Sequence, residues 1–259
     1  MQSFPTRIAG LVCIALSIAG CKNSGTSAST TPTPNATVVG LWTGTDADST
    51  LGLNAVIDST GEMIVIRSDG AQFVGNLQIS GDTIVAALGG YANFGSSFPD
   101  NSIYGIGTLD GAVNPGTSMT ATVSFTTNGN TSIPGSWSFT PGALTSVGSS
   151  LPSVTGNFTD NATGATVSIT SSGAMTSQNE PGAGCVLKGT IGTANPAIDE
   201  YQVSYTLQLC TANYAVLNGV SFTGMGYLDF STIPATLIYA VAGSLANGNF
   251  GIVSNLTGP

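Results

Sequence analysis

Acidic residues that lie close together along the chain have the clearest potential for chemistry. Asp46 and Asp48 form one such pair, and Asp199 and Glu200 form another. Two neighbouring carboxylates can act as general acid and base in glycoside hydrolysis. Both pairs, however, fall among Gly, Asp, Ser and Pro residues, which typically form turns. We therefore expect turns at both places and keep a carboxylate-based hydrolase as the less favoured alternative.

Other catalytic and binding chemistry is poorly represented in the composition. The chain has no histidine, so the commonest general base and metal ligand is missing. A Ser–Lys pair would depend on Lys188, and two cysteines alone do not complete a zinc site. Lys and Arg number 4 against 13 Asp and Glu, so the basic surface of a nucleic-acid-binding protein is missing too. The sequence predicts a non-enzymatic protein that binds no nucleic acid, metal or other cofactor.

The beginning of the chain has the layout of an export signal. Arg7 precedes an apolar run at 8–19, which is too short to cross a bilayer core of ~30 Å as a helix. The run leads into Ile18-Ala19-Gly20-Cys21, which resembles the lipobox of bacterial lipoproteins. This resemblance implies that residues 1–20 are a signal peptide and that Cys21 carries lipid, including fatty acids such as palmitate. Lys22 then implies sorting to the outer membrane of a bacterial cell envelope.

Residues 21–37 are predicted to be the lipidated cysteine and a disordered tether. The stretch after Cys21 is rich in Ser, Thr, Pro and Gly, and such a composition does not build a core. A flexible chain of this length has a root-mean-square span of about 20–25 Å. The folded part would therefore stand off a membrane that it contacts through its lipid anchor.

The rest of the chain shows internal sequence similarity between its first and second halves. The clearest match pairs Tyr104–Asp110 with Thr223–Asp229, and other matches occur in the same order at similar offsets. Such self-similarity indicates repeated domains. We infer two tandem copies, 38–141 and 153–259, joined by a linker at 142–152. Chance similarity within a chain rich in Gly and Thr is the alternative.

Each copy is predicted to be all-β. Residues 72–79 and 201–209 alternate between apolar and polar side chains, as antiparallel strands with one wet face do. Short turn signals separate such runs, which favours a meander of about eight strands per copy that closes into a small barrel. A β-sandwich is the alternative. In the first copy the expected strands are near 39–44, 51–58, 62–67, 72–79, 83–88, 103–110, 118–126 and 133–140.

A closed barrel would have two consequences. It would place the first and last strands side by side, with Trp42 next to Trp137 in the first copy. Its interior would either be filled by side chains or hold one small apolar ligand, so a carrier is an alternative function. At this general level the body of the chain is similar to small β-barrels of bacterial surface lipoproteins, although no diagnostic motif supports that likeness.

The cysteines divide by their place in the chain. Cys13 would leave with the signal peptide and Cys21 would take the lipid, which leaves Cys185 and Cys210. In an exported domain two such cysteines are expected to form a disulfide. Cys210 has the wrong parity for a core-facing strand residue, so we place it just past a strand end or on a bulge. A catalytic thiol pair is the alternative.

The longest insertion without a matching copy, 89–101, is the candidate binding loop. It carries Tyr91, Phe94 and Phe98 among small residues, and exposed aromatic rings on loops often form recognition surfaces. The alternative is that these rings plug one end of the barrel. Its shorter counterpart in the second copy is Thr211–Gly219. The predicted function is a lipid-anchored envelope lipoprotein whose tandem β domains bind another envelope protein or polymer.

Overall fold

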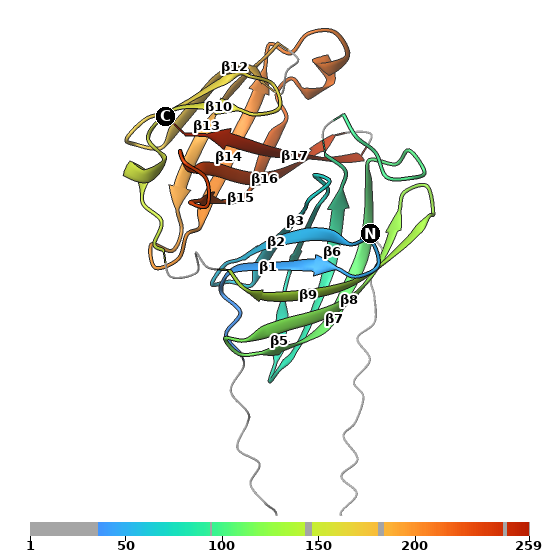
Figure 1. Ribbon diagram of the computed structural model, residues 1–259. Helices are drawn as coiled ribbons and strands as arrows, with labels where there is room; N and C mark the ends of the chain where they lie inside the picture. Colours follow the sequence, from blue (N-terminus) through green and yellow to red (C-terminus); the bar gives the residue numbers. More distant parts are fainter. Residues whose placement is uncertain (1–35, 94, 143–146, 181–183, 246–247, 259) are drawn as a thin grey trace, which may run out of the picture. The chain divides into compact units, whose positions relative to one another are not determined.

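The structure is a computed structural model that describes residues 36–93, 95–142, 147–180, 184–245 and 248–258. These residues form antiparallel strands and two short 3-10 helices (Figure 1). They belong to one compact unit, Pro34–Pro259. Among the described residues, no helix has both the length and the apolar character needed to span a membrane. The predicted signal peptide, Cys21 and most of the predicted tether lie outside these ranges.

The first barrel is an antiparallel meander whose ends meet. Consecutive strands pair, except that β4 and β5 do not pair with each other; β1 also pairs with β9, and β4 pairs with β6. Because β4 and β5 both pair with β6, they act as one strand interrupted at Leu77, and the ring has eight members. The strands are β1 (Gly40–Asp46), β2 (Leu51–Ile57), β3 (Glu62–Arg67), β4 (Gln72–Asn76), β5 (Gln78–Ser80), β6 (Thr83–Tyr91), β7 (Tyr104–Asn114), β8 (Ser118–Thr127) and β9 (Ser132–Pro141).

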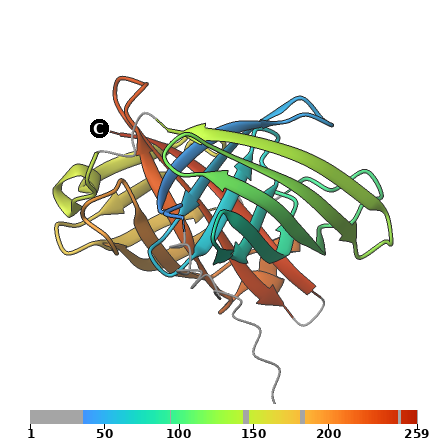
Figure 2. The same ribbon diagram turned by 90° about the horizontal axis from the view of Figure 1, so that it is seen from below.

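The second barrel repeats this plan. It closes through β10 and β17, and Figure 2 shows the ribbon from below. The 3-10 helix η1 (Leu151–Val154) precedes it, and η2 (Ala212–Leu217) lies between β14 and β15. Its strands are β10 (Gly156–Asp160), β11 (Thr166–Ile169), β12 (Ala174–Glu180), β13 (Cys185–Thr193), β14 (Tyr201–Gln208), β15 (Ser221–Asp229), β16 (Thr236–Leu245) and β17 (Gly248–Thr257).

These observations confirm the predicted all-β fold with two closed eight-stranded barrels in tandem. The β-sandwich is wrong, because the first and last strands of each copy are paired. The sequence match between Tyr104–Asp110 and Thr223–Asp229 falls on β7 and β15, which hold the same place in their rings. The expected strands of the first copy coincide with the observed ones to within a few residues.

The seam of the first barrel is in the expected place, but its register differs from the expectation. Trp42 lies opposite Pro141, and Trp137 lies opposite Asp46. The two tryptophans are therefore not cross-strand neighbours, although both are buried in the same cluster. Strands in a closed barrel are tilted and staggered, so residues at matching places in the first and last strands do not meet.

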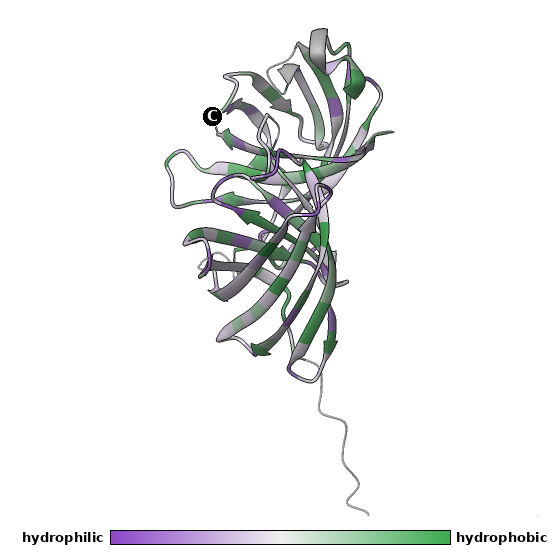
Figure 3. Cartoon of the chain, turned by 90° about the vertical axis from the view of Figure 1, so that its right-hand side faces the viewer, coloured by the Kyte–Doolittle hydropathy of each residue, from purple (hydrophilic) through white to green (hydrophobic). Residues whose placement is uncertain are grey.

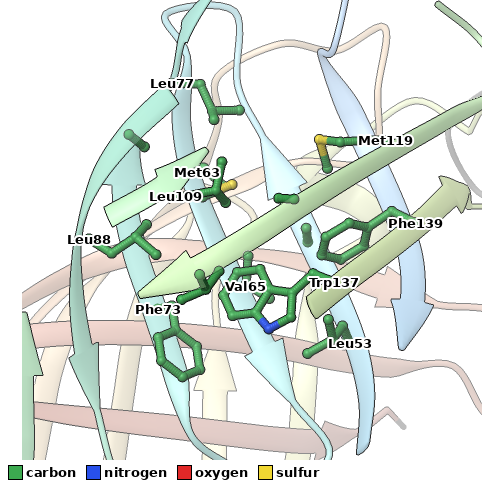
Figure 4. Packing of buried hydrophobic residues seen from close by; sticks show 14 of the residues in the cluster. Leu53, Met63, Val65, Phe73, Leu77, Leu88, Leu109, Met119, Trp137 and Phe139 are labelled. Carbon is green, nitrogen blue, oxygen red and sulfur yellow. The ribbon is translucent and has the colours of Figure 1, made fainter. Parts of the chain in front are cut away.

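Alternating side chains fill both barrel interiors. On β8 every second residue is buried, and Figure 3 shows apolar and polar residues alternating along single strands. In the first barrel the centre is aromatic, with Phe73 against Trp137 at 5.2 Å between ring centroids (Figure 4). In the second, Tyr205 packs between Phe222 and Tyr239. Burial of these apolar side chains stabilises each barrel.

A third apolar cluster joins the two barrels. It combines the outer faces of β1, β2 and β3 with the outer faces of β15 and β16. Because both faces of these strands are covered, β3 has five consecutive buried residues. The buried members of this inter-barrel cluster are Leu41, Val56, Ile64, Ile66, Met225, Tyr227 and Ala240.

Candidate functional site

The predicted aromatic loop is partly strand. β6 continues to Tyr91, so the connection to β7 consists of residues 92–103. Tyr91 is 7% exposed and Phe98 is 3% exposed, while Phe94 lies outside the described residues. The expected exposure of aromatic rings is therefore wrong for Tyr91 and Phe98, because each is buried against a barrel.

Phe98 closes one end of the first barrel. Its ring centroid lies 5.3 Å from that of Phe125, and both belong to the cluster that fills the barrel. Burial of a phenyl ring stabilises by about 1.5–3 kcal/mol, and aromatic pairing adds about 0.5–1.5 kcal/mol. For Phe98 the plug interpretation is therefore correct.

Tyr91 is buried in a different direction. Its side chain hydrogen-bonds to Asn249 of β17, and burial raises the pKa of the Tyr91 hydroxyl above its usual value. A Cβ atom at Gly251 would collide with Cβ of Tyr91, so the two chains approach closely there. Tyr91 therefore holds β6 of the first barrel against β17 of the second.

The loop tip is fixed to the neighbouring hairpin. The Asp100 carboxylate accepts hydrogen bonds from the Thr127 hydroxyl and from Ser102 N at 3.0 Å. These bonds, the Thr127 bond first, lower the pKa of Asp100 to about 2. Gly129 N also donates to Ser102 Oγ at 3.0 Å. These bonds hold Asp100–Ser102 against the β8–β9 hairpin.

A groove lies where this loop faces the second barrel, and we call it the junction groove. Its volume is about 240 Å³. Ile103 and Val216, on opposite walls, are 36% and 56% exposed. The predicted loop and its predicted counterpart thus form the two sides of one groove. The lining residues are Ala92, Asn93, Gly95, Ser96, Ile103, Tyr214, Val216, Leu217, Leu245 and Phe250.

The groove side of the loop is tied to the last strands of the second barrel. Val253 N donates to Asn93 Oδ1 at 3.0 Å, and Gln72 Nε2 donates to the Val241 carbonyl at 2.9 Å. β10 pairs with β17 at only two residue pairs, so most of β17 extends beyond that seam. The first barrel covers this extension, which limits the exposure of a strand edge.

The predicted disulfide between Cys185 and Cys210 is present. Cys210 follows the last residue of β14 by two positions, after Leu209 with φ 54°, so the placement just past a strand end is confirmed. The Asn218 side chain accepts from Cys210 N at 2.7 Å and donates to the Cys210 carbonyl at 3.1 Å. Together these bonds fix the connection that carries η2 and therefore one wall of the junction groove.

The first predicted carboxylate pair forms a turn. Asp46 is 2% exposed, and its carboxylate accepts hydrogen bonds from Ser49 Oγ at 2.7 Å, Asp48 N at 3.3 Å and Ser136 N at 3.3 Å. Asp48 is exposed. The turn interpretation is therefore correct here, because the hydrogen-bonding capacity of Asp46 is used within its own turn and the adjacent strand.

The second pair lies in the turn and bend connection between β13 and β14, as expected, but it is buried, so the solubility interpretation is wrong for it. Asp199 is 3% exposed and Glu200 is 0% exposed. Asp199 Oδ2 accepts from Leu228 N at 3.0 Å, but Asp199 Oδ1 and both Glu200 oxygens have no hydrogen-bond partner among the described residues. Burial, above all, raises the pKa of both carboxyl groups to about 7. Such groups can hold a proton near neutral pH.

Glu200 lies close to acidic residues of the other barrel. Its pKa is also raised by the negative charges of Asp58 and Glu62, which flank the β2–β3 turn. Glu62 lines a cleft of about 420 Å³ with residues from β13, β14 and β15. Neither Asp199 nor Glu200 lines that cleft or the junction groove, so both carboxyl groups lie behind other atoms.

No protein-family model, curated protein or solved structure matches the chain. In the described part of the chain, no group of three or more His, Cys, Asp or Glu side chains could hold a metal ion.

Sequence reasoning missed the partners that join the barrels. Asn93 and Gln72 have no distinguishing sequence pattern, because a single polar residue can serve many roles. The inter-barrel cluster does have a signal: Met63–Ile66 and Leu237–Val241 lack the polar residues that alternate on a half-exposed strand. Such runs indicate strands buried on both faces.

Proposed function

We propose that this protein is a lipid-anchored lipoprotein of the bacterial cell envelope, most simply of the outer membrane. Its two barrels act as one non-enzymatic binding module, and the junction groove receives an apolar segment of another envelope protein. The observation that carries this proposal is the groove itself, whose walls come from both barrels and include exposed apolar side chains at Ile103 and Val216.

The anchor is supported by the N-terminal sequence. Ile18-Ala19-Gly20-Cys21 follows a short apolar run, as it does in bacterial lipoproteins. The Cys185–Cys210 disulfide suits an oxidising compartment outside the cytoplasm. Two acyl chains hold a protein on a membrane durably, whereas one holds it only marginally.

The shape and lining of the groove support a protein partner over a polymer or a small molecule. Its volume of about 240 Å³ is smaller than the roughly 300–1,000 Å³ of typical ligand pockets. A space of that size suits one or two apolar side chains. The walls are held by Asp100 on one side and by the disulfide on the other, so the groove needs little ordering before it binds.

The carrier alternative has weaker support. A carrier needs space inside a barrel, but large buried side chains occupy both interiors, including Phe73, Phe125, Tyr201 and Tyr239. The cavities described above lie outside the barrels. We therefore place binding at the junction groove.

A photo-crosslinking amino acid at Val216 of the full-length protein tests the binding site in intact cells. We expect a discrete adduct at Val216 and none at Thr122, an exposed residue on β8. The further substitution Ile103→Asp should remove the Val216 adduct, because a charge in the groove disfavours an apolar segment. Equal labelling at both positions, or an adduct that survives Ile103→Asp, would reject the groove. Incorporation of labelled palmitate, lost in Cys21→Ser, tests the anchor separately.

A further inference from the structure

The β2–β3 turn of the first barrel lies against the chain that enters β14 of the second. Asp58 and Glu62 flank the turn, and Glu200 immediately precedes β14. Along β14, Tyr201 and Val203 point into the barrel core, so Glu200 has the parity of the outer face. It is nevertheless 0% exposed, because the first barrel covers it.

Glu200 has no compensating contact for a negative charge. Neither of its carboxylate oxygens has a hydrogen-bond partner among the described residues. Removing an ionised carboxylate from water without a partner is strongly unfavourable, so such a group binds a proton instead. The geometry alone therefore favours a neutral Glu200 in this arrangement.

The groups that face Glu200 increase this preference. Asp58 is 4% exposed, and its carboxylate is held in place by hydrogen bonds from Thr60 N and Glu62 N, each at 2.8 Å. Burial, and then the charge of Asp58, raise the pKa of Glu62 above its usual value. Asp199 is adjacent in the chain and is itself close to the negative charge of Asp229.

The positive charges of the described residues do not compensate Glu200. They are those of Arg67 and Lys188, the only basic side chains after residue 35. Arg67 pairs with Asp69 at 2.8 Å and lies over the Phe73 ring. Lys188 is exposed on β13. Burial and negative neighbours alone account for the raised pKa of Glu200.

We propose that a proton on Glu200 controls the docking of the two barrels. When Glu200 is protonated, the β2–β3 turn and the outer face of β14 pack together. When Glu200 loses its proton, its charge is repelled by Asp58 and Glu62, and the inter-barrel cluster opens. This inference concerns the interface and does not depend on the proposed partner or anchor.

The direction of the pH effect follows from linkage. Glu200 has a pKa of about 7 when docked, against a usual value of 4.5, so docking takes up a proton. Docking is strongest below pH ~4.5 and weakens as the pH rises through about 7. Between these values each pH unit changes the docking equilibrium by up to about tenfold. The apolar cluster and the Asn93 and Gln72 bonds oppose opening.

The methionines provide internal reporters of docking. Met225 is 1% exposed within the inter-barrel cluster. Met63 and Met119 are buried inside the first barrel, and Met175 is buried inside the second. Peroxide oxidation of each methionine to the sulfoxide requires solvent access, and mass spectrometry resolves the sites separately. Opening of the interface should expose Met225 and leave the other three protected.

The experiment measures oxidation rates in the full-length protein at pH 5.5 and pH 8.5. We expect Met225 to oxidise at least about tenfold faster at pH 8.5, with Met63, Met119 and Met175 unchanged. Glu200→Gln keeps the shape of the protonated group, so oxidation of Met225 in this variant should stay slow at both pH values.

The matched control is Asp110→Asn, which removes a carboxylate from an exposed position on β7 and should behave as wild type. Equal Met225 rates at both pH values in wild type would overturn the proposal. So would a Glu200→Gln variant that follows wild type, or acceleration of all four methionines together, which would indicate global unfolding. If Glu200→Gln does not fold, Asp199→Asn separates the two carboxyl groups whose pKa is about 7. A midpoint near pH 7 that persists in Asp199→Asn supports control by Glu200. A midpoint that Asp199→Asn abolishes, or a wild-type midpoint near 4.5, contradicts it.

Discussion

The two barrels share strand number and order but close differently. β1 and β9 of the first barrel share five residue pairs, whereas β10 and β17 of the second share two. The second barrel carries the disulfide. Its last strands accept a hydrogen bond from Gln72 of the first barrel and donate one to Asn93. Equal strand counts therefore do not imply that the two barrels are equally stable on their own. A barrel with a short seam depends on a covalent bond and on its neighbour.

Replacing the plug of the first barrel should have the largest effect. Phe98→Ala removes a buried ring from contact with Phe125, and such substitutions cost about 3–5 kcal/mol. Trp42 and Trp137 both lie in the first barrel, so denaturant unfolding followed by tryptophan fluorescence reports on that barrel. Ile106→Ala, on β7 of the same barrel at a residue that is 70% exposed, should cost less than about 1 kcal/mol. A similar loss in both variants would show that Phe98 is not a plug.

Removing the disulfide should affect the second barrel selectively. Replacing both Cys185 and Cys210 by Ser releases a connection that spans 25 residues and should lower the free energy of unfolding by about 3 kcal/mol. Hydrogen exchange resolved by peptide should show faster exchange in β13–β15 and little change in β7–β9. Equal acceleration in both barrels would contradict the unequal dependence inferred from the two seams.

A smaller effect on stability is expected from replacing Asp199, which is buried in the second barrel. The pKa of Asp199 is about 7 in the folded protein, above its usual 3.8, so its contribution to stability is fully present below pH ~4 and is lost as the pH rises through 7. Asp199→Asn should reduce the loss of stability between pH 5 and pH 8 by about 2 kcal/mol. Urea unfolding at both pH values, followed by peptide-resolved exchange, measures this difference.

The control for Asp199 is Asp46→Asn in the first barrel. The Asp46 carboxylate accepts hydrogen bonds within a turn of the first barrel. This variant should therefore retain the wild-type dependence of second-barrel stability on pH. An unchanged pH dependence in Asp199→Asn would show that this carboxyl group does not titrate with unfolding.

Much of the fold could be predicted because it is encoded locally. Alternation along 72–79 and 201–209, with turn residues between strands, was sufficient to predict the strands, their meander order and closure. The repeat located the second barrel, and the parity of Cys210 placed it beyond the end of β14. These features depend on neighbours in sequence or on consecutive strands, which local patterns specify.

The site was harder to predict because it depends on contacts between distant outer faces. Nothing near Glu200 in sequence distinguishes it from the turn carboxylate Asp46, since its burial is caused by strands β2 and β3. Likewise, no sequence pattern around Tyr91 and Phe98 distinguishes an aromatic residue that a loop exposes from one that it buries. The uninterrupted apolar run Met63–Ile66 was the one local signal that a second surface covers β3.

The position of Lys188 has a practical consequence. It is the only lysine after residue 22, and its side chain is exposed on β13. In a fragment whose amino terminus is blocked and which lacks Lys22, an amine-reactive dye would attach at a single place on the second barrel. Paired with the indole emission of Trp42 and Trp137, that dye would give an energy-transfer ruler between the two halves of the molecule, without any engineered residue.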